Sequence, residues 1–296
     1  AWLPSKDLLS TDELIEIIEV AVSQGIDEIR LTGGEPMLRP DIVEIVARIS
    51  SIKNAPKLSM TTNGLVLAKL AKPLVDAGLR RINISLDTLD REVFKKMTHR
   101  DRIEDVFAGI AAAKEAGLLP VKINTVLLRG VNDGEAVSLL KWALAEDLNL
   151  RFIEQMPLDA GGIWSREQLI TADEIFAQLS EHYELTPVEY RGSAPAEEFL
   201  INGGPATVGI IGSVSRPFCG ACDRIRITSD GQLRSCLFSM TETDLRSILR
   251  SDLSQSEKTE ALVSKFHSTV KAKLPGHGIN DPSFIQPARP MSAIGG

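Results

Sequence analysis

Three cysteines in the last third of the sequence are the residues best suited to chemistry. Cys219 and Cys222 form a Cys-x2-Cys pair, and Cys236 follows after 13 intervening residues. An odd number of thiols in one short segment does not suit a disulfide framework, and it indicates a metal site in a reducing compartment. Three thiolates can hold a zinc ion that needs one more ligand, or three irons of a [4Fe–4S] cluster.

The histidines favour the second of these two sites. None of them lies at zinc-finger spacing from the cysteines: they are His99, His182, His267 and His277. The pattern therefore favours a cluster with one iron that has no protein ligand and can take a substrate nitrogen or oxygen. A structural zinc with a distant fourth ligand stays open as an alternative.

Two arginines follow the Cys-x2-Cys pair closely. Arg224 and Arg226 are separated by one residue, so in a strand their side chains would point to the same face. Two guanidinium groups on one side form a clamp for a phosphate or another anion. The alternative is an ordinary strand with solvated arginines.

Alternating helical and strand patterns precede the cysteine segment and must position it. Strands are predicted over residues 27–32, 57–62, 81–86, 121–127 and 150–156, with helices over 41–51, 65–77, 103–117 and 135–146 between them. Another helix, capped by Ser10, comes before the first strand. Strands joined through helices predict a parallel sheet with right-handed crossovers.

Polar groups and glycines lie where these strands end. The carboxyl ends of parallel strands carry the ligands in barrels and open α/β sheets. Each such residue alone is more often a cap or a satisfied core group, but together they predict a pocket. They are the Thr32-Gly33-Gly34-Glu35 turn, Thr61 to Gly64, Ser85, Asp87, Lys122, Asn124 and Met156.

The composition changes after Pro157, and a domain boundary is expected there, between residues 1–157 and 158–296. The second part is predicted to hold a helix capped by Thr171, a hairpin over 225–234 and a helix over 257–272. The tail, residues 275–296, is predicted to be loop.

The charge balance excludes some classes of protein. With 33 basic and 40 acidic side chains, the net charge of −7 argues against a nucleic-acid surface. No apolar run approaches the roughly 18–20 residues that span a bilayer, so no membrane association is expected. The expected location is the cytoplasm, or an organellar matrix in a eukaryote.

Taken together, the motifs resemble those of the radical S-adenosylmethionine (SAM) enzymes and, within them, of the GTP 3′,8-cyclase family of molybdenum cofactor biosynthesis. The RLTGGEP turn at 30–36 is shared across the superfamily. The cysteine–arginine motif and the Gly-Gly end are specific to the cyclases. The matching segments are 30–36, 61–64, 85–87, 218–228, 230–231, 236–238 and 295–296.

The resemblance implies a fold and a reaction. The fold is an α/β partial (β/α)6 TIM-like barrel, whose first strand is missing from this chain, with a C-terminal α+β extension that carries an iron–sulfur site. The cofactors are two [4Fe–4S] clusters and SAM, which is cleaved to a 5′-deoxyadenosyl radical. The reaction is that of a lyase: the radical takes a hydrogen from C3′ of GTP, and C3′ attacks C8 to give 3′,8-cyclo-7,8-dihydro-GTP.

The resemblance also assigns residues by position. The SAM positions are Gly34, Ser85 and Met156, and the GTP positions are Arg30, Thr61, Lys122, Arg224 and Arg226. The ligands of the second cluster are Cys219, Cys222 and Cys236. The terminal Gly295 and Gly296 form a tail that the family needs for turnover.

One departure from the family is clear. The Cys-x3-Cys-x2-Cys motif of the first cluster is absent, since no cysteine precedes Cys219. We expect that roughly forty residues of the parent protein, with a first strand and its loop, are not represented, and that the chain as given is inactive without them.

The family further implies partners: GTP as substrate, an electron donor, a downstream pterin synthase and a homodimer. Two other functions stay open. One is a peptide-modifying radical SAM maturase with an auxiliary cluster, and the other is a zinc-stabilised nucleotide-binding protein without enzyme activity.

Overall fold

The computed structural model describes residues 4–159, 161–162, 164–189, 191–282 and 284–295. Within these residues one eight-stranded sheet has the order β1-β2-β3-β4-β5-β8-β7-β6. Its strands are β1 (Glu28–Leu31), β2 (Lys57–Thr62), β3 (Arg81–Ser85), β4 (Lys122–Val126), β5 (Asn149–Ile153), β6 (Leu185–Pro187), β7 (Glu197–Ile201) and β8 (Thr207–Ile211).

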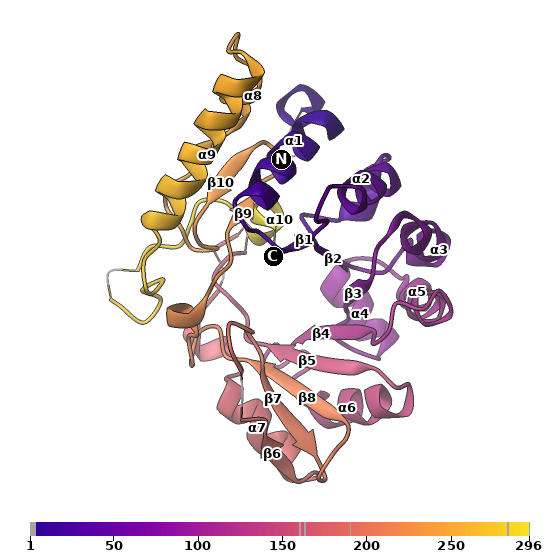
Figure 1. Ribbon diagram of the computed structural model, residues 1–296. Coiled ribbons are helices and arrows are strands. Elements are labelled where there is room, and N and C mark those ends of the chain that lie inside the picture. Colours follow the sequence, from indigo (N-terminus) through magenta and orange to yellow (C-terminus); the bar gives the residue numbers. More distant parts are fainter. Residues whose placement is uncertain (1–3, 160, 163, 190, 283, 296) are drawn as a thin grey trace.

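Helices line the outer side of this curved sheet (Figure 1). They are α1 (Thr11–Ser23), α2 (Ile42–Ser50), α3 (Leu67–Ala77), α4 (Arg91–Thr98), α5 (Ile103–Glu115), α6 (Ala136–Ala145) and α7 (Ala172–Ser180). The expected local signals set their ends. Ser10 and Thr171 each form a capping box at a helix start, and Gly78 ends α3 in the left-handed conformation.

The first five strands are adjacent and parallel in chain order, which confirms the predicted parallel sheet. Their ends agree with the sequence patterns within one residue, except at β5. The strand predicted over 150–156 ends at Ile153, so Met156 lies in the loop beyond it. The α/β class is confirmed, and the curved sheet with its outer helices is consistent with a partial TIM-like barrel.

The two faces of the sheet differ sharply in polarity. One face packs against the helices through apolar side chains that are fully or almost fully buried, among them Ile84, Ile123 and Phe152. The register places the alternate, polar residues side by side on the other, concave face. Its rows are Arg30, Ser59 and Arg81; then Thr61, Asn83 and Lys122; then Ser85, Asn124 and Arg151.

The sheet continues past residue 157. β8 pairs with β5 in parallel, and β7 and β6 extend the sheet with antiparallel pairs. None of these three strands was predicted; β7 and β8 lie in residues 195–217, which are rich in Gly and Pro and show only short apolar runs. A division into residues 1–157 and 158–296 stays a prediction.

The C-terminal part adds a second, smaller layer. The predicted hairpin is present as β9 (Arg226–Ile227) and β10 (Gln232–Arg234), with β11 (Thr243–Asp244) at the edge of the same three-stranded sheet. Two helices, α8 (Arg246–Leu249) and α9 (Gln255–Lys271), follow.

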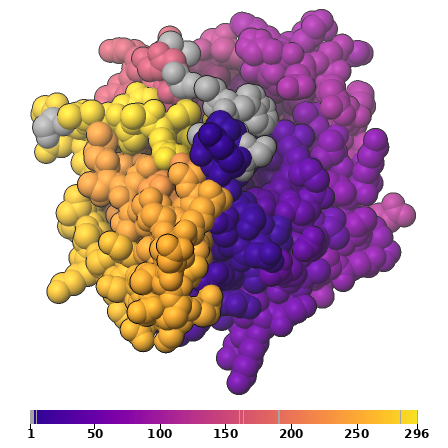
Figure 2. Space-filling view, turned by 90° about the horizontal axis from the view of Figure 1, so that it is seen from above, coloured from indigo at the N-terminus to yellow at the C-terminus, as the bar shows by residue number. Residues whose placement is uncertain are grey.

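Apolar side chains join this layer to the first helix. Ile17 of α1 packs with Leu233 of β10 and Leu262 of α9 in one buried cluster. The main chain also links the N-terminal segment to this C-terminal layer, since Leu9 N donates to Ser229 O at 2.8 Å. Figure 2 shows the resulting contact of the C-terminal segment, orange to yellow, with the indigo N-terminal segment.

The prediction that the whole tail is loop is wrong. Met291–Ile294 forms a short helix, α10, that follows Pro290. Four residues are too few for a helix that is stable by propensity alone. Tertiary contacts hold it: Ile294 is 1% exposed, and it belongs to a buried cluster with Leu158 and Phe238.

Among the residues that the structure describes, no helix has the length and apolar character needed to cross a membrane.

Candidate active site

The concave face of the sheet carries a cluster of cations. Arg30 and Lys122, both predicted as GTP positions, lie there together with Arg81 and Arg151. Burial is the main cause that lowers the pKa of both Arg30 and Lys122, and the charge of Arg151 lowers both further. Positive charge gathered on one face of a sheet is typical of a binding site for an anion.

Two carboxylates balance part of this charge. Glu28 pairs with Arg81 at 2.6 Å, and Glu198 pairs with Arg151 at 3.2 Å. Gly209 on β8 leaves room for Arg151, because a Cβ at this glycine would come within 2.9 Å of Arg151 Cγ. Glycine on the neighbouring strand is thus what lets the arginine side chain lie across the concave face.

Neutral polar groups complete the rows. Asn83 Nδ2 donates to Thr61 Oγ1 at 3.2 Å, so the predicted GTP position Thr61 is held by its neighbour. The buried Oδ1 of Asn124 has no hydrogen-bond partner among the described residues. An unpaired buried acceptor between Ser85 and Arg151 is costly in the free protein, and it is available to a ligand hydroxyl or amine.

The cysteine segment lies in the C-terminal part. Cys219, Cys222 and Cys236 are free, half-buried thiols. Burial raises the pKa of the Cys219 thiol, a main-chain hydrogen bond from His277 opposes this, and the charges of Cys236 and Cys222 raise it further. The three sulfurs therefore lie near enough to affect one another.

Cations surround Cys222 in particular. Lys273 Nζ lies 3.5 Å from its sulfur and Arg224 Nη2 lies 3.6 Å from it. Burial raises the pKa of the Cys222 thiol, but the main-chain and side-chain groups of Arg224 and the charge of Lys273 outweigh this, and the pKa is lowered overall. The thiolate, which is the form that binds a metal, is thereby favoured.

The donor set fits one iron–sulfur cluster in number and kind, namely three thiols next to cations that favour thiolate. The thiols are not already gathered as ligands: in the part of the chain with a described structure, no three His, Cys, Asp or Glu side chains form a group that could hold a metal ion. For a further cluster there are no ligands here, because the sequence contains 3 cysteines in all.

The two arginines of this segment differ in position. β9 begins at Arg226, so Arg224 precedes the strand, and the condition that both side chains lie in one strand is not met. Arg224 lies over the ring of Phe218, with 5.0 Å from Cζ to the ring centroid. Arg226 is the more buried, and burial, followed by the charge of Arg224, lowers its pKa to about 10.

The cysteine segment comes close enough to the sheet for Arg224 to interact electrostatically with a residue of β1. The charge of Arg224 lowers the pKa of Arg30, which lies on β1. The structure therefore brings four of the predicted GTP residues into one electrostatic cluster with two cations that were not predicted, and Thr61 lies beside them. The cluster comprises Arg30, Lys122, Arg224 and Arg226, with Arg81 and Arg151.

The predicted SAM positions lie at the carboxyl ends of the strands. Ser85 is the last residue of β3 and lines a cavity of about 230 Å³ that Asp87 and Phe94 also line. Met156 lies in the loop after β5 and packs against a small apolar cluster. Gly34 lies in the turn after β1. The three positions share one edge of the sheet.

The turn at Gly34 is fixed by the glutamate that follows it. Glu35 accepts hydrogen bonds from Met37 N at 3.1 Å, from Thr62 Oγ1 at 2.8 Å and from Asn63 N at 2.7 Å. Its carboxylate thus joins the end of β1 to the end of β2.

The C-terminal tail reaches this same turn. A Cβ on Gly34 would lie 3.6 Å from the main-chain oxygen of Ser292, and one on Gly295 would come within 3.1 Å of Thr32 Cγ2. Gly295 also has a φ of 83°, in the left-handed region. Both the space and the conformation therefore favour glycine there. The predicted Gly296 lies outside the described residues.

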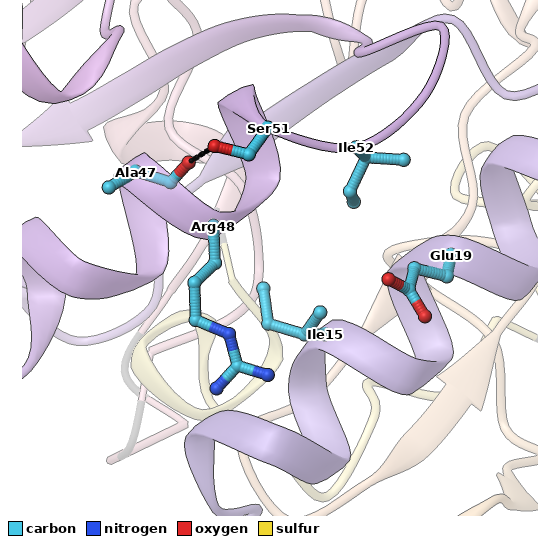
Figure 3. Close-up of a pocket in the computed structure, with 6 residues that line it drawn as sticks. All are labelled: Ile15, Glu19, Ala47, Arg48, Ser51 and Ile52. Atoms are coloured by element: carbon cyan, nitrogen blue, oxygen red, sulfur yellow. Dashed lines mark hydrogen bonds between the residues drawn. The ribbon is translucent and has the colours of Figure 1, made fainter.

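A second pocket lies in the outer helical layer, away from the concave face. A groove of about 320 Å³ lies between α1 and α2. Figure 3 shows residues that line it, among them Ile15, Glu19 and Arg48. It belongs to the outer helical layer and contains none of the predicted site residues.

Sequence reasoning missed several residues of the site: Arg81, Asn83, Arg151, Glu198 and Lys273. A signal for three of them existed. Arg81, Asn83 and Arg151 alternate with Ile82, Ile84, Leu150 and Phe152, and this period of two predicts one polar and one apolar face. Lys273 has no such signal, because its contact with Cys222 spans 51 positions of the sequence.

Comparison with known proteins places the chain in a superfamily first. The model of the Radical SAM superfamily matches residues 2–143, and that of Molybdenum Cofactor Synthesis C matches residues 148–279. A solved structure described as native anSMEcpe with bound AdoMet has a similar fold, with a TM-score of 0.55 and 15% identity, over 90% of this chain and 75% of that chain. The chain is a member of the radical SAM superfamily.

Curated relatives narrow this to one family. A GTP 3′,8-cyclase of Streptomyces coelicolor is 54% identical over 100% of this chain and 86% of its own length. A GTP 3′,8-cyclase of Mycobacterium sp. (strain KMS) is 50% identical over 100% of this chain and 84% of its own length. The chain belongs to the GTP 3′,8-cyclase family.

Proposed function

We propose that the protein binds GTP and SAM and takes part, as a lyase, in the rearrangement of GTP to 3′,8-cyclo-7,8-dihydro-GTP in molybdenum cofactor biosynthesis. The observation that carries the proposal is the meeting of two sets of cations. One set, with Arg30 and Lys122, stands on the concave face of the sheet, and the other, Arg224 and Arg226, flanks the cysteine segment.

A triphosphate suits this cation cluster. The chain has a net charge of −7, so a polyanion binds only where positive charge is gathered locally. Burial and mutual repulsion lower the pKa of Arg226 to about 10, and a phosphate oxygen beside it relieves both causes. Each charge-assisted hydrogen bond to such an oxygen contributes about 1.5–3 kcal/mol.

The purine end would lie toward the cysteines. We propose that Cys219, Cys222 and Cys236 hold a [4Fe–4S] cluster whose remaining iron supplies a Lewis-acidic position for the guanine base. Lys273 and Arg224 lie beside the sulfur of Cys222 and favour its thiolate form. The ring of Phe218 lies under Arg224 at this site and supports its guanidinium group.

The SAM end would lie at the strand ends. Ser85 offers a hydroxyl, and Asn124, beside it in the same row on β4, offers the unpaired Oδ1. Both are groups that bind ribose hydroxyls. The superfamily implies a [4Fe–4S] cluster that supplies a 5′-deoxyadenosyl radical from SAM. These 296 residues contain no further cysteines for it, so initiation requires ligands and an external electron donor that this sequence does not provide.

The experiment is anaerobic turnover by a version of the enzyme that carries ligands for both clusters. We expect 5′-deoxyadenosine to form only when GTP is present, together with the cyclic product. Arg91→Ala, at an exposed ion pair with Asp101, is the matched control and should leave product formation unchanged. Failure to form either product with both clusters loaded would rule out the proposal.

A further inference from the structure

The C-terminal helix α10 needs an external anchor to stay at the Gly34 turn. Its four residues make a single turn, which is unstable in isolation. Two tertiary contacts hold the helix itself: Met291 N donates to Leu158 O at 2.8 Å, and Ile294 is buried. Both act on residues of α10 and not on the segment that precedes Pro290.

Arg289 is the last charged residue of the sequence and directly precedes Pro290. Its Nη1 and Nη2 donate to the two carboxylate oxygens of Asp230 at 3.0 and 2.9 Å. Its Nε lies 2.8 Å from Oε1 of Glu242. A guanidinium bound on two edges by two carboxylates has a fixed orientation, which a single ion pair would not give.

The network continues into the core of the C-terminal layer. Glu242 also pairs with Arg234, whose side chain is 3% exposed. Thr228 Oγ1 donates to Asp230 at 2.5 Å. Two arginines thus face two carboxylates, and the side chain of Asp230 is 11% exposed, so salt screens these pairs less than it screens surface pairs.

Asp230 lies in the turn of the β9–β10 hairpin. One arm of this hairpin carries Arg226, and Cys236 follows the other. The ion pairs of Arg289 therefore join the tail to the same hairpin that presents a substrate cation and a cluster ligand.

We propose that Arg289 is the positioning residue of the C-terminal tail. Its ion pairs with Asp230 and Glu242 hold α10 and Gly295 against the turn at Thr32 and Gly34. This inference rests on the proposed function, which makes that turn part of the SAM site. Docking of the tail and the geometry of the β9–β10 hairpin are then one coupled unit.

The experiment is amide hydrogen exchange of the chain, followed by mass spectrometry of peptides. In Arg289→Ala we expect the amides of residues 291–295 to exchange at least tenfold faster than in the unchanged protein. The amides of α9 should keep their rates, because α9 packs on α1 independently of the tail. Equal protection of 291–295 in both proteins would overturn the proposal.

Two further variants guard against simple misfolding. Arg289→Lys keeps the charge but loses the two-pronged bond to Asp230, and it should give an intermediate acceleration. Arg91→Ala removes an exposed pair of similar geometry, with bonds of 2.7 and 2.9 Å to Asp101, and should not alter exchange in the tail. If Arg289→Ala does not fold, Arg289→Lys decides: tail exchange as slow as in the unchanged protein contradicts the role.

Kinetics of the enzyme with both clusters distinguish positioning from general stability. Arg289→Ala should lower kcat at least tenfold while the Kd for GTP changes less than twofold, and Arg289→Lys should restore part of kcat. A parallel loss of GTP affinity would contradict a role confined to the tail. If the tail is released in the exchange experiment but the unchanged enzyme makes no cyclic product, the proposed function fails and the anchor stands.

Discussion

The ammonium group of Lys273 lies 3.5 Å from the sulfur of Cys222 and donates at 2.6 Å to the main-chain oxygen of Arg224. The loop after α9 thus holds a cation against one of the three thiols. Hydrogen bonds to the sulfurs of an iron–sulfur cluster are among the factors that set its reduction potential.

Replacement of Lys273 should therefore shift that potential. In Lys273→Met we expect a more negative midpoint potential for the cluster, because the reduced, more negative form loses a nearby positive charge. Lys273→Arg should retain most of the unchanged value. Redox titration followed by electron paramagnetic resonance measures both, and Lys271→Met, at the exposed end of α9, is the control. Identical potentials in all four proteins would exclude the contact.

Loss of Arg226 should weaken GTP binding far more than SAM binding. Arg226 is half-buried, burial lowers its pKa to about 10, and it lies on β9, between Cys222 and Cys236 in the sequence. The loss of one charge-assisted bond, about 1.5–3 kcal/mol, corresponds to roughly 10- to 150-fold in Kd. Isothermal titration calorimetry of Arg226→Ala with GTP and with SAM measures the change in each Kd, and Arg91→Ala is the control. Equal weakening of binding for both ligands would contradict the assignment.

Gly295→Ala should reduce turnover without unfolding the protein. The added methyl would meet Thr32 Cγ2 at 3.1 Å, and the φ of 83° disfavours alanine by about 1–2 kcal/mol. The matched control is Gly276→Ala, where an added Cβ meets nothing within 4 Å. We expect kcat to fall about tenfold in the first variant and to stay unchanged in the second. Equal rates would remove the close approach from the mechanism.

Asp87 should make stability depend on pH. Burial raises its pKa from 3.8 to about 6, against a hydrogen bond from Val126 N. The folded state then binds the proton more tightly than the unfolded state, so this group's favourable contribution is complete below about pH 4 and is lost as the pH rises through 6.

Urea unfolding at several pH values measures this effect. Between about pH 4 and pH 7 the unchanged protein should lose about 1–3 kcal/mol that Asp87→Asn keeps. The asparagine can still accept the bond from Val126 N. Asp252→Asn, at an exposed carboxyl, should follow the unchanged protein. Parallel pH profiles for Asp87→Asn and the unchanged protein would contradict the raised pKa.

Local patterns carried most of the fold. Period-two and period-3.6 alternation placed β1 to β4 within one residue, and Ser10 and Thr171 marked helix starts because capping is decided by residues three apart. β7 and β8 were not predicted, because their own composition does not mark them as strands. They are defined by their partners: β8 pairs with β5, and β7 pairs with β8.

The residues of the site likewise fall into two groups: those that the sequence identified and those that became clear only from the structure. The cysteines and Lys122 were identified from residue type and position, and Arg30 from the family resemblance. Arg151 needed the neighbouring Gly209, and Arg289 needed Asp230, 59 positions away. The period of two marked Arg151 as part of a polar face, but the ion pairs of Arg289 form only when folding brings distant segments together, so no local signal marks them.

The most direct test of the account is a GTP titration of the anaerobically reconstituted chain, followed by metal analysis and electron paramagnetic resonance of the reduced cluster. We expect about four irons and four sulfides per chain, lost in Cys219→Ser, Cys222→Ser and Cys236→Ser, and a cluster signal that changes when GTP, but not ATP, is added. One zinc per chain without iron or sulfide, or a cluster signal that GTP leaves unchanged, would contradict the account.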